Sequence, residues 1–450
     1  MRFVVIGGDA AGMSAASQAR RRATPDQLEI VAFERGHFTS YSACGLPYFV
    51  ADDVKAAHEL IARTPEQHRA NGIELHLRHE VTAIDPTART VTVRDLDHDT
   101  TREESFDHLL IATGASPVRP DLPNVDADGV HGIQTLADGI SLRDHVDRHP
   151  DGARAVVVGG GYIGLEMGEA MKRRGFDVTV VEAGEQPLSS LDYDMGALVA
   201  DAIRDMGIHL HTSTKVTGFE TTDGHVSAVV TESGTLPADL VVLGIGVKPN
   251  VALAEAAGIA LGRTGAIATD DRMATNVDGI WAGGDCAESL HRITGKRVAI
   301  ALGTHANKHG RVIGLNVTGG NARFPGVVGT AATKVCAYEV ARTGLTERKA
   351  AEEGFVTDAV TIKATTRSGY MPDAQPITVK MVVERSSRRI LGAQIIGRDG
   401  AAKRIDIVAT ALWNEMTAED LLFCDLAYAP PFSPLWDPVQ VAARKLVASP

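Results

Sequence analysis

The chain has 450 residues, of which 44% are hydrophobic and 23% charged, and its formal net charge at pH 7 is -12. This length exceeds one ordinary hydrophobic core, so we expect two to four domains. Acidic and basic residues are interleaved, which predicts no face for nucleic acid or an anionic membrane, and no apolar run approaches the roughly 18 residues of a membrane span.

The start of the chain and its cysteines predict a cytoplasmic protein. Met1 and Arg2 lead directly into a hydrophobic strand, without the charged, apolar and cleavage regions of a signal peptide. The cysteines lie far apart, which indicates neither a secreted disulfide framework nor a CxxC metal pair. They are Cys44, Cys286, Cys336 and Cys424. We therefore predict no metal site and expect any reactive thiol to act singly.

A strand, a glycine turn and a helix are predicted twice, at residues 2–12 and 154–164. In each copy the next strand ends in an acid, Glu34 or Glu182, about 20 residues beyond the last glycine. Such a turn admits a diphosphate, the helix N-terminus attracts it, and the acid binds ribose hydroxyls. The glycines expected to contact the two dinucleotides are Gly7, Gly12, Gly159, Gly161 and Gly164.

The two copies differ at the middle glycine of the turn. Asp9 stands there in the first copy, which is therefore the poorer match, whereas the second copy is complete. Glu182 is followed by Ala183 and Gly184 with no arginine nearby, a pattern that favours the free 2'-hydroxyl of NADH over the phosphate of NADPH.

Three later segments also end in turns. Residues 109–117 and 240–250 are hydrophobic strands closed by glycine and proline, and we interpret them as crossover strands between domains. Residues 275–286 predict a short strand that ends at Gly284 and Asp285, and this aspartate could hydrogen-bond a polyhydroxyl chain.

With these elements in this order, the chain resembles the flavoprotein disulfide reductases that contain two dinucleotide-binding domains, essentially from end to end. The resemblance implies an α/β fold with two Rossmann-like domains, for FAD and NAD, and a C-terminal α+β dimerisation domain. The expected FAD-binding domain is discontinuous (1–116 and 247–323), with the NAD(P)H-binding domain at 117–246. The composition changes near residue 324 to a pattern of strands and helices that the resemblance identifies as the dimerisation domain, at 324–450. The resemblance also implies a homodimer, in which each active site would borrow Tyr370 and Tyr428 from its neighbour.

The resemblance also assigns roles to residues near the flavin. Thr113, Gly114 and Asp285 match family segments that contact FAD, with Asp285 at the ribitol chain. Tyr162 matches an aromatic gate that covers the flavin until NADH displaces it, although packing within the helix would also explain a tyrosine there.

One segment, Ser40 to Tyr48, determines the subgroup. Members with a redox dithiol carry CxxxxC here, but Thr39 and Phe49 flank Cys44 at that spacing, so the dithiol is absent. Ser40 and Cys44 instead match the SxxxC motif of single-cysteine members, with Ser40 at the cofactor. These are coenzyme A-disulfide reductases, persulfide or polysulfide reductases, and NADH oxidases and peroxidases. A packing cysteine is the alternative.

Further residues favour one branch of this subgroup. Ala10 replaces the histidine with which the oxidases and peroxidases reduce oxygen or peroxide, so the resemblance favours the coenzyme A-disulfide and persulfide branch. Tyr370 and Tyr428 match two tyrosines that approach the cysteine from the partner subunit as proton donors. Arg22 matches a basic position that grips coenzyme A phosphates, or it simply complements the helix C-terminus.

We therefore expect hydride to pass from NADH to FAD and electrons to pass to an oxidised Cys44, releasing a thiol. The sequence leaves open whether Cys44 rests as a thiol, a sulfenic acid or a mixed disulfide, and which acceptor it reduces. One alternative is an NADH oxidase or peroxidase that uses the sulfenic acid. Another is a reductase for a protein electron carrier, or an NADH-binding redox sensor.

Overall fold

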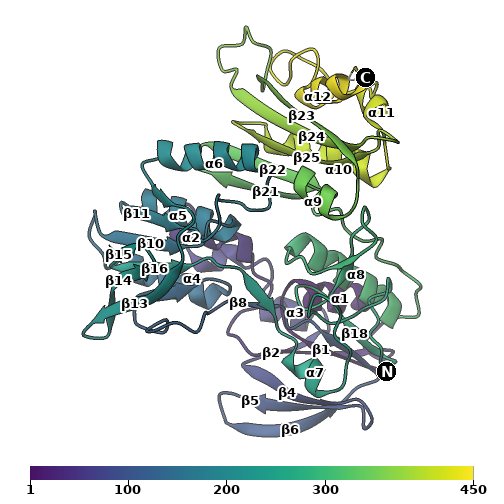
Figure 1. The fold of residues 1–450 in the computed structure, drawn as a ribbon. Helices are drawn as coiled ribbons and strands as arrows, with labels where there is room; N and C mark the ends of the chain where they lie inside the picture. The colour runs from purple at the N-terminus through teal and green to yellow at the C-terminus, as the bar shows by residue number, and fades with distance from the viewer. Residues whose placement is uncertain (449–450) are drawn as a thin grey trace.

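Three five-stranded sheets organise residues 1–448, which the computed structural model of the chain describes (Figure 1). Two sheets are parallel and flanked by helices, and the third, near the C-terminus, is antiparallel. The predicted fold class, two Rossmann-like units followed by an α+β unit, is confirmed.

The first parallel sheet has the strand order β18-β7-β1-β2-β3. Its strands are short hydrophobic runs that are buried because helices and loops cover both faces. Glycines at 310 and 314 let helix α8 pack closely on α1, since a Cβ at either would lie 2.3 or 2.4 Å from a backbone oxygen of α1. The strands of this sheet are β1 (Arg2–Ile6), β2 (Glu29–Glu34), β3 (Glu74–Leu77), β7 (His108–Ile111) and β18 (Ile280–Ala282).

This first unit also contains helices, a small antiparallel sheet and a short hairpin. Its helical segments are α1 (Ala10–Arg20), η1 (Ala43–Gly45), α2 (Leu46–Val50), η2 (Ala57–Leu60), α3 (Pro65–Ala70), α7 (Ala252–Ala256) and α8 (Gly303–Val317). The further strands are β4 (His79–Asp85), β5 (Thr90–Asp95) and β6 (Thr100–Ser105), with the hairpin β19 (Ser289–Leu290) and β20 (Arg297–Val298).

The second parallel sheet has the order β12-β11-β10-β16-β9 and repeats the design of the first. Its strands are β9 (Val130–Gly132), β10 (Arg154–Val158), β11 (Asp177–Val181), β12 (His209–His211) and β16 (Leu240–Leu243). Its helices are α4 (Leu136–Val146), α5 (Tyr162–Arg173) and α6 (Tyr193–Asp205). A small antiparallel sheet completes the unit, with strands β13 (Val216–Thr222), β14 (His225–Thr231) and β15 (Gly234–Pro237).

The chain crosses between the two units through a ribbon of two antiparallel strands, β8 (Ala115–Pro117) and β17 (Val247–Pro249). The prediction of crossover strands is right for the second half of each segment and wrong for the first. Residues 108–111 and 240–243 are buried strands inside the two sheets, because their apolar side chains find a core there.

The third unit is a five-stranded antiparallel sheet with the order β21-β22-β25-β24-β23. In the strand at residues 376–384 seven consecutive residues are buried, because both faces of the sheet are covered there. Its strands are β21 (Ala331–Val335), β22 (Tyr338–Gly344), β23 (Thr357–Thr365), β24 (Pro376–Glu384) and β25 (Ile390–Gly397). Its helical segments are α9 (Glu347–Glu352), η3 (Ala402–Arg404), α10 (Ile405–Trp413), α11 (Ala418–Leu422) and α12 (Pro438–Val447).

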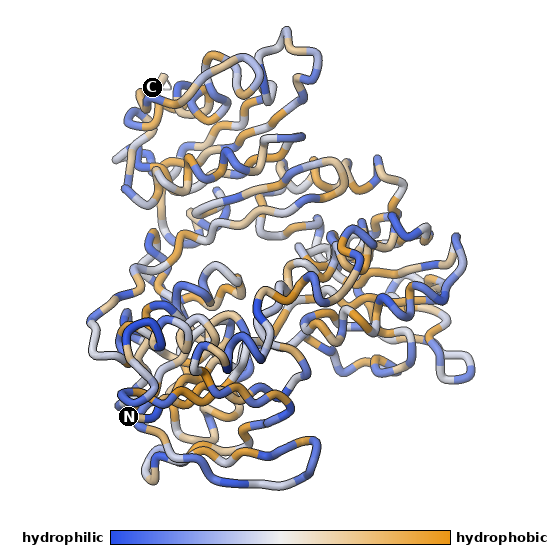
Figure 2. Tube along the Cα trace, turned by 180° about the vertical axis from the view of Figure 1, so that it is seen from behind, coloured by the Kyte–Doolittle hydropathy of each residue, from blue (hydrophilic) through white to orange (hydrophobic). Residues whose placement is uncertain are grey.

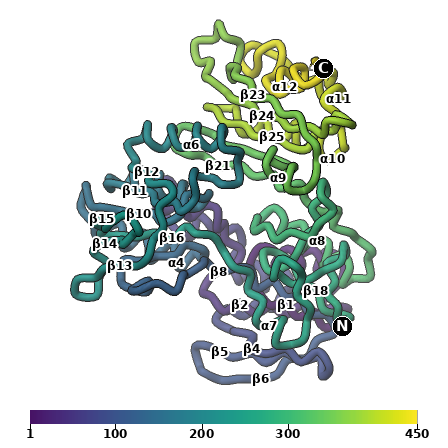
Figure 3. The backbone as a smooth tube through the Cα atoms, in the orientation of Figure 1, coloured from purple at the N-terminus to yellow at the C-terminus, as the bar shows by residue number. Residues whose placement is uncertain are grey.

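The arrangement of the units is clearest in the backbone tube (Figure 3), where helix α6 of the second unit lies against the antiparallel sheet. Seen from behind, hydrophobic segments concentrate in the strands inside each unit, and hydrophilic ones at outer loops (Figure 2). Among residues 1–448, no helix combines the length and hydrophobicity that a bilayer crossing requires.

Candidate active site

The first glycine turn joins β1 to α1 in a space that admits no side chain. Gly7 has φ +107°, and a Cβ on it would lie 2.2 Å from the carbonyl oxygen of Ala112. A Cβ on Gly12 would lie 1.9 Å from the carbonyl oxygen of Gly7. Both glycines are therefore required for the backbone to close this turn, as a dinucleotide cradle demands.

The second turn, between β10 and α5, repeats this geometry. A Cβ on Gly159, at φ +105°, would lie 2.5 Å from the carbonyl oxygen of Gly244, and one on Gly164 would lie 1.9 Å from that of Gly159. Gly161 differs, because its nearest neighbour would be 3.8 Å away. Its side of the turn is open, which suits the close approach of a diphosphate.

The two predicted acids occupy matching positions at the ends of β2 and β11. Glu34 accepts hydrogen bonds from the amides of Gly8 and Gly36, at 2.8 and 2.7 Å. Glu182 accepts them from Gly160 and from the glycine two residues beyond Glu182 itself, both at 2.6 Å. Each carboxylate thus stands at the edge of its glycine turn, where a ribose would lie.

A third turn, after β18, brings Asp285 to the first unit. Gly284, at φ +80°, donates its amide to Nδ1 of His309 at 3.1 Å, and Nε2 of this histidine lies 3.1 Å from Ser289 Oγ. Burial lowers the pKa of His309 to about 3 and raises that of Asp285. The histidine is a neutral support for the turn, and the sequence analysis missed it.

Two more predicted residues, Thr113 and Gly114, follow β7. Thr113 Oγ1 donates to the carbonyl of Asn250 at 2.7 Å, and Asn250 Nδ2 donates to the carbonyl of Thr113 at 2.9 Å. Gly114 has φ +65° and would place a Cβ in open space. Asn250, which the sequence analysis did not single out, therefore fixes this turn from the returning crossover strand.

Ser40 connects the cysteine segment to the first glycine turn. Its backbone has φ +50°, and its amide donates to the carbonyl of Gly8 at 3.3 Å. Its Oγ lies 2.9 Å from Nε2 of His68, a buried histidine whose pKa burial lowers to about 4. The Nδ1 atom of His68 has no hydrogen-bond partner among residues 1–448.

Cys44 is exposed and lies in the 3-10 turn η1, immediately before helix α2. Its pKa is raised, first because the surrounding protein desolvates the sulfur, and then because the charges of Glu166 and Asp285 oppose a thiolate. Glu166 belongs to α5 of the second unit and Asp285 to the first. Carboxylates of both Rossmann-like units therefore act on the Cys44 sulfur.

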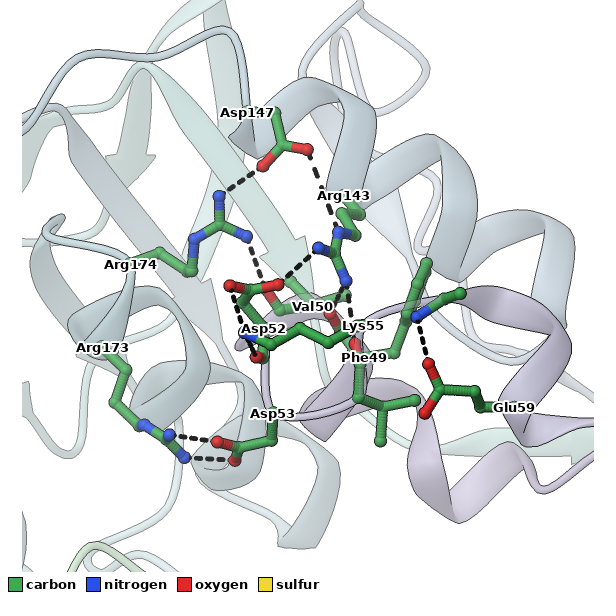
Figure 4. A network of polar contacts seen from close by, with 12 residues as sticks. Phe49, Val50, Asp52, Asp53, Lys55, Glu59, Arg143, Asp147, Arg173 and Arg174 are labelled. Atoms are coloured by element: carbon green, nitrogen blue, oxygen red, sulfur yellow. Dashed lines mark hydrogen bonds and ion pairs between the residues drawn. The ribbon is translucent and has the colours of Figure 1, made fainter.

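The helix that follows Cys44 is fastened to the second unit by arginines (Figure 4). Arg143 of α4 donates to the carbonyl of Phe49 at 2.8 Å and to a carboxylate oxygen of Asp52 at 2.6 Å, and its guanidinium lies over the Phe49 ring. Arg174 donates to the carbonyl of Val50 at 3.0 Å. These contacts fix the distance between the cysteine and the second unit, and no local sequence pattern announced them.

Tyr162 stands at the start of α5 as predicted, with its hydroxyl bound from two sides. Arg342 Nε of β22 donates to it at 3.2 Å, and Ser190 Oγ lies 3.3 Å away. The position is therefore tied to the third unit.

Tyr370 and Tyr428 lie in the third unit and are 74% and 45% exposed. The buried guanidinium of Arg404 donates to the carbonyls of Thr366 and Phe432 and thereby joins the loops that carry them. The structure thus brings the two tyrosine loops together, and no hydrogen bond within residues 1–448 links either tyrosine to the cysteine segment.

Arg22, the predicted substrate-binding residue, is exposed after α1. Its Nε donates to Thr318 Oγ1 at the end of α8, 3.1 Å away. Arg20, by contrast, is committed to three backbone carbonyls of its own unit. Arg22 therefore keeps donors for an anion, as does Arg21, which is also exposed at this helix end.

Comparison with known proteins identifies the family. The family model of pyridine nucleotide-disulphide oxidoreductases matches residues 1–310, and that of their dimerisation domain matches residues 330–438. Over 449 residues the chain is 39% identical to the NAD(P)H coenzyme A polysulfide/persulfide reductase of Pyrococcus horikoshii, covering 99% of this chain and 98% of the relative.

Two other relatives show the range of the family. An NADH oxidase of Methanocaldococcus jannaschii is 34% identical, with 99% of this chain and 98% of the relative covered. The structure of an NAD-dependent persulfide reductase from A. fulgidus superposes with a TM-score of 0.96 at 38% identity, covering 99% of this chain and 83% of that one. The chain belongs to the pyridine nucleotide-disulphide oxidoreductase family, whose members are FAD-dependent and use NAD(P)H.

Proposed function

We propose that this chain is an FAD-dependent NAD(P)H oxidoreductase that reduces a low-molecular-weight disulfide or persulfide, of the coenzyme A disulfide kind, through Cys44. The observation that carries the proposal is one exposed thiol, on which carboxylates of both Rossmann-like units act, with no second cysteine in its segment. Because a lone thiol cannot form an internal disulfide, its disulfide partner must be the substrate. The persulfide reductase from Pyrococcus horikoshii supports this reading.

The geometry of the two glycine turns is compatible with two bound dinucleotides. We propose that residues 1–116 and 247–323 hold FAD through the turn at Gly7 and Gly12, with Glu34, Ser40, Thr113, Gly114 and Asp285 around it. Residues 117–246 would hold the nicotinamide nucleotide through Gly159, Gly161, Gly164 and Glu182, beneath Tyr162. Bound FAD would accept hydride and supply electrons in pairs. Glu182, which accepts a hydrogen bond from the amide of Gly160 in the second turn, would bind the ribose and favour NADH. Comparable kcat/KM values for NADH and NADPH would refute that preference.

The proposed reaction at Cys44 reduces one substrate disulfide to two thiols for each NADH oxidised. A mixed disulfide between Cys44 and a small thiol takes two electrons and one proton, its S–S bond breaks, and one free thiol leaves. The Cys44 thiolate then attacks a substrate disulfide and releases the second thiol, which takes another proton. The acids near Cys44 oppose the thiolate, so this form should be short-lived between the release of the first thiol and the attack on the next disulfide.

We propose a homodimer formed through residues 324–450. The family match to a dimerisation domain supports it, and so do large exposed apolar side chains near the C-terminus. They are Phe423, Tyr428, Phe432, Leu435 and Trp436. In such a dimer Tyr370 and Tyr428 would reach the partner's cysteine, where a phenol can protonate a departing thiolate.

We place the enzyme in the cytoplasm, since its four cysteines are unpaired.

We propose that Arg22 binds a phosphate of the coenzyme A moiety, because its guanidinium is exposed and, within residues 1–448, bonds only Thr318. Arg22→Ala should raise KM for coenzyme A disulfide several-fold and leave KM for NADH unchanged. An unchanged KM for the disulfide would remove Arg22 from the binding site.

The strongest competing function is an NADH oxidase or peroxidase, as in the relative from Methanocaldococcus jannaschii. Ala10 at the start of α1 weighs against it, because a methyl group can neither donate nor hold a proton for oxygen chemistry. Electron transfer to a protein carrier is less favoured, because it leaves the exposed thiol of Cys44 without a role.

Anaerobic titration of the NADH-reduced enzyme separates these functions. We expect coenzyme A disulfide or polysulfide to reoxidise it faster than peroxide does. Cys44→Ser should abolish that reaction but keep the reduction of an artificial dye by NADH, whereas the matched variant Cys424→Ser should keep both. Full disulfide reductase activity in Cys44→Ser would refute the mechanism, and preferential reaction with peroxide would favour the oxidase or peroxidase.

A further inference from the structure

Asp9 occupies the place in the first turn that Gly161 holds in the second, at the N-terminus of α1. Its backbone is extended, with φ -123° and ψ -150°. The side chain makes no capping hydrogen bond to its own helix, although aspartate is among the preferred capping residues. At α12 the equivalent residue, Asp437, does accept a bond from the amide of Val439, at 2.9 Å. The carboxyl of Asp9 therefore does not serve as the cap of α1.

The groups around the Asp9 carboxyl are acidic. Asp9 is half-buried, and the charged groups that act on it most strongly are Glu34, at the end of β2, and Asp285, in the turn after β18. Burial and then these two carboxylates raise its pKa to about 7, against a smaller lowering by the backbone of Tyr41 and of Ala10. An ionised Asp9 would thus be unfavourable in this turn even without a ligand.

FAD adds two phosphate charges to the same turn, because the diphosphate of a dinucleotide lies against the glycine turn and the first amides of the helix. A charged carboxylate at the middle position would repel it. A protonated carboxyl would instead offer one O–H donor. We propose that Asp9 binds FAD only in its protonated form, donating a hydrogen bond to the diphosphate, so that FAD binding takes up one proton in alkaline solution.

The inference concerns FAD alone and holds whichever acceptor Cys44 reduces. Its quantitative consequence follows from linkage. Above the pKa of Asp9 in the free protein, each further pH unit should weaken FAD binding by up to about tenfold, until the pKa in the complex is reached. Below the pKa of Asp9 in the free protein, Asp9 should cause no change of FAD affinity with pH.

The test is FAD titration of the apoenzyme between about pH 6 and about pH 9, followed by quenching of flavin fluorescence. The wild type should show a constant Kd near pH 6 and a rising Kd above about pH 7. Asp9→Asn, which stays neutral, and Asp9→Gly, which restores the glycine, should show Kd values that do not rise there. Asp26→Asn, at an exposed aspartate elsewhere in the same unit, should keep the wild-type profile.

Two results would overturn the proposal: a wild-type Kd that is flat across this range, or an equal alkaline rise in both Asp9 variants. The glycine variant covers the possibility that asparagine disturbs the turn. Because no acceptor or nicotinamide is present, the result is independent of the proposed reductase activity, which the anaerobic titration tests separately.

Discussion

Asp9→Asn should stabilise the apoenzyme, and the gain should grow with pH. In the unfolded chain this carboxyl ionises near its ordinary pKa of 3.8, whereas burial beside Glu34 and Asp285 raises the folded value to about 7. The wild type therefore loses stability progressively as the pH rises from about 4 to about 7, and asparagine does not. A separation of about three pH units corresponds to about 4 kcal/mol, an upper bound because the turn can relax around a charged group.

The assay is thermal or urea unfolding of both apoproteins near pH 5 and near pH 8, compared as apparent midpoints because a chain of several domains need not unfold in one step. The variant should gain at least about 1 kcal/mol more over the wild type at the higher pH. Asp26→Asn should show no such growth. A variant whose advantage is the same at both pH values, or one that is less stable near pH 8, would contradict the acidic setting assigned to Asp9.

Other substitutions test the site and its supports. Glu166→Gln should lower the pKa of the Cys44 thiol, because it removes a negative charge that opposes the thiolate. The pH profile of alkylation by iodoacetamide measures this pKa. The control Glu169→Gln should shift the pKa less, because the charge of Glu169 is paired with a lysine at 3.0 Å. Lys380→Met should cost about 3–5 kcal/mol, because this 8% exposed lysine holds three carboxylates between the second and third units. Lys334→Met, at an ion pair whose lysine is 49% exposed, should cost less than about 1 kcal/mol in the same unfolding assay.

The glycine turns were predictable because their geometry is local. Gly7 and Gly12 are only five residues apart. In the structure the carbonyl of Gly7 lies so close to Gly12 that position 12 has no room for a side chain. The acids at the ends of β2 and β11 follow from the length of one helix and one strand. The cysteine segment was recognisable for the same reason, since its residues are contiguous.

The supports of the site were not predictable, because each depends on partners far apart in sequence. Asn250 is 137 residues from Thr113, and Arg143 is 94 residues from Phe49. Histidine and arginine are common on any helix, so their presence in the sequence did not distinguish them. The small sheets β4–β6 and β13–β15 were also missed, because exposed antiparallel strands carry a weaker hydrophobic pattern than the buried parallel ones.

The charges around Cys44 bear on how a lone thiol can turn over. Many reactive cysteines are activated by a nearby cation, yet the charges that act on this sulfur, Glu166 and Asp285, are both acids. A mixed disulfide is neutral and tolerates these neighbours, whereas the thiolate left after reduction does not. Reduction should therefore be followed promptly by protonation of Cys44 or by attack on the next substrate. A proton donor outside this acidic site, such as a tyrosine of a second subunit, would protonate the departing thiol without adding another carboxylate beside the sulfur.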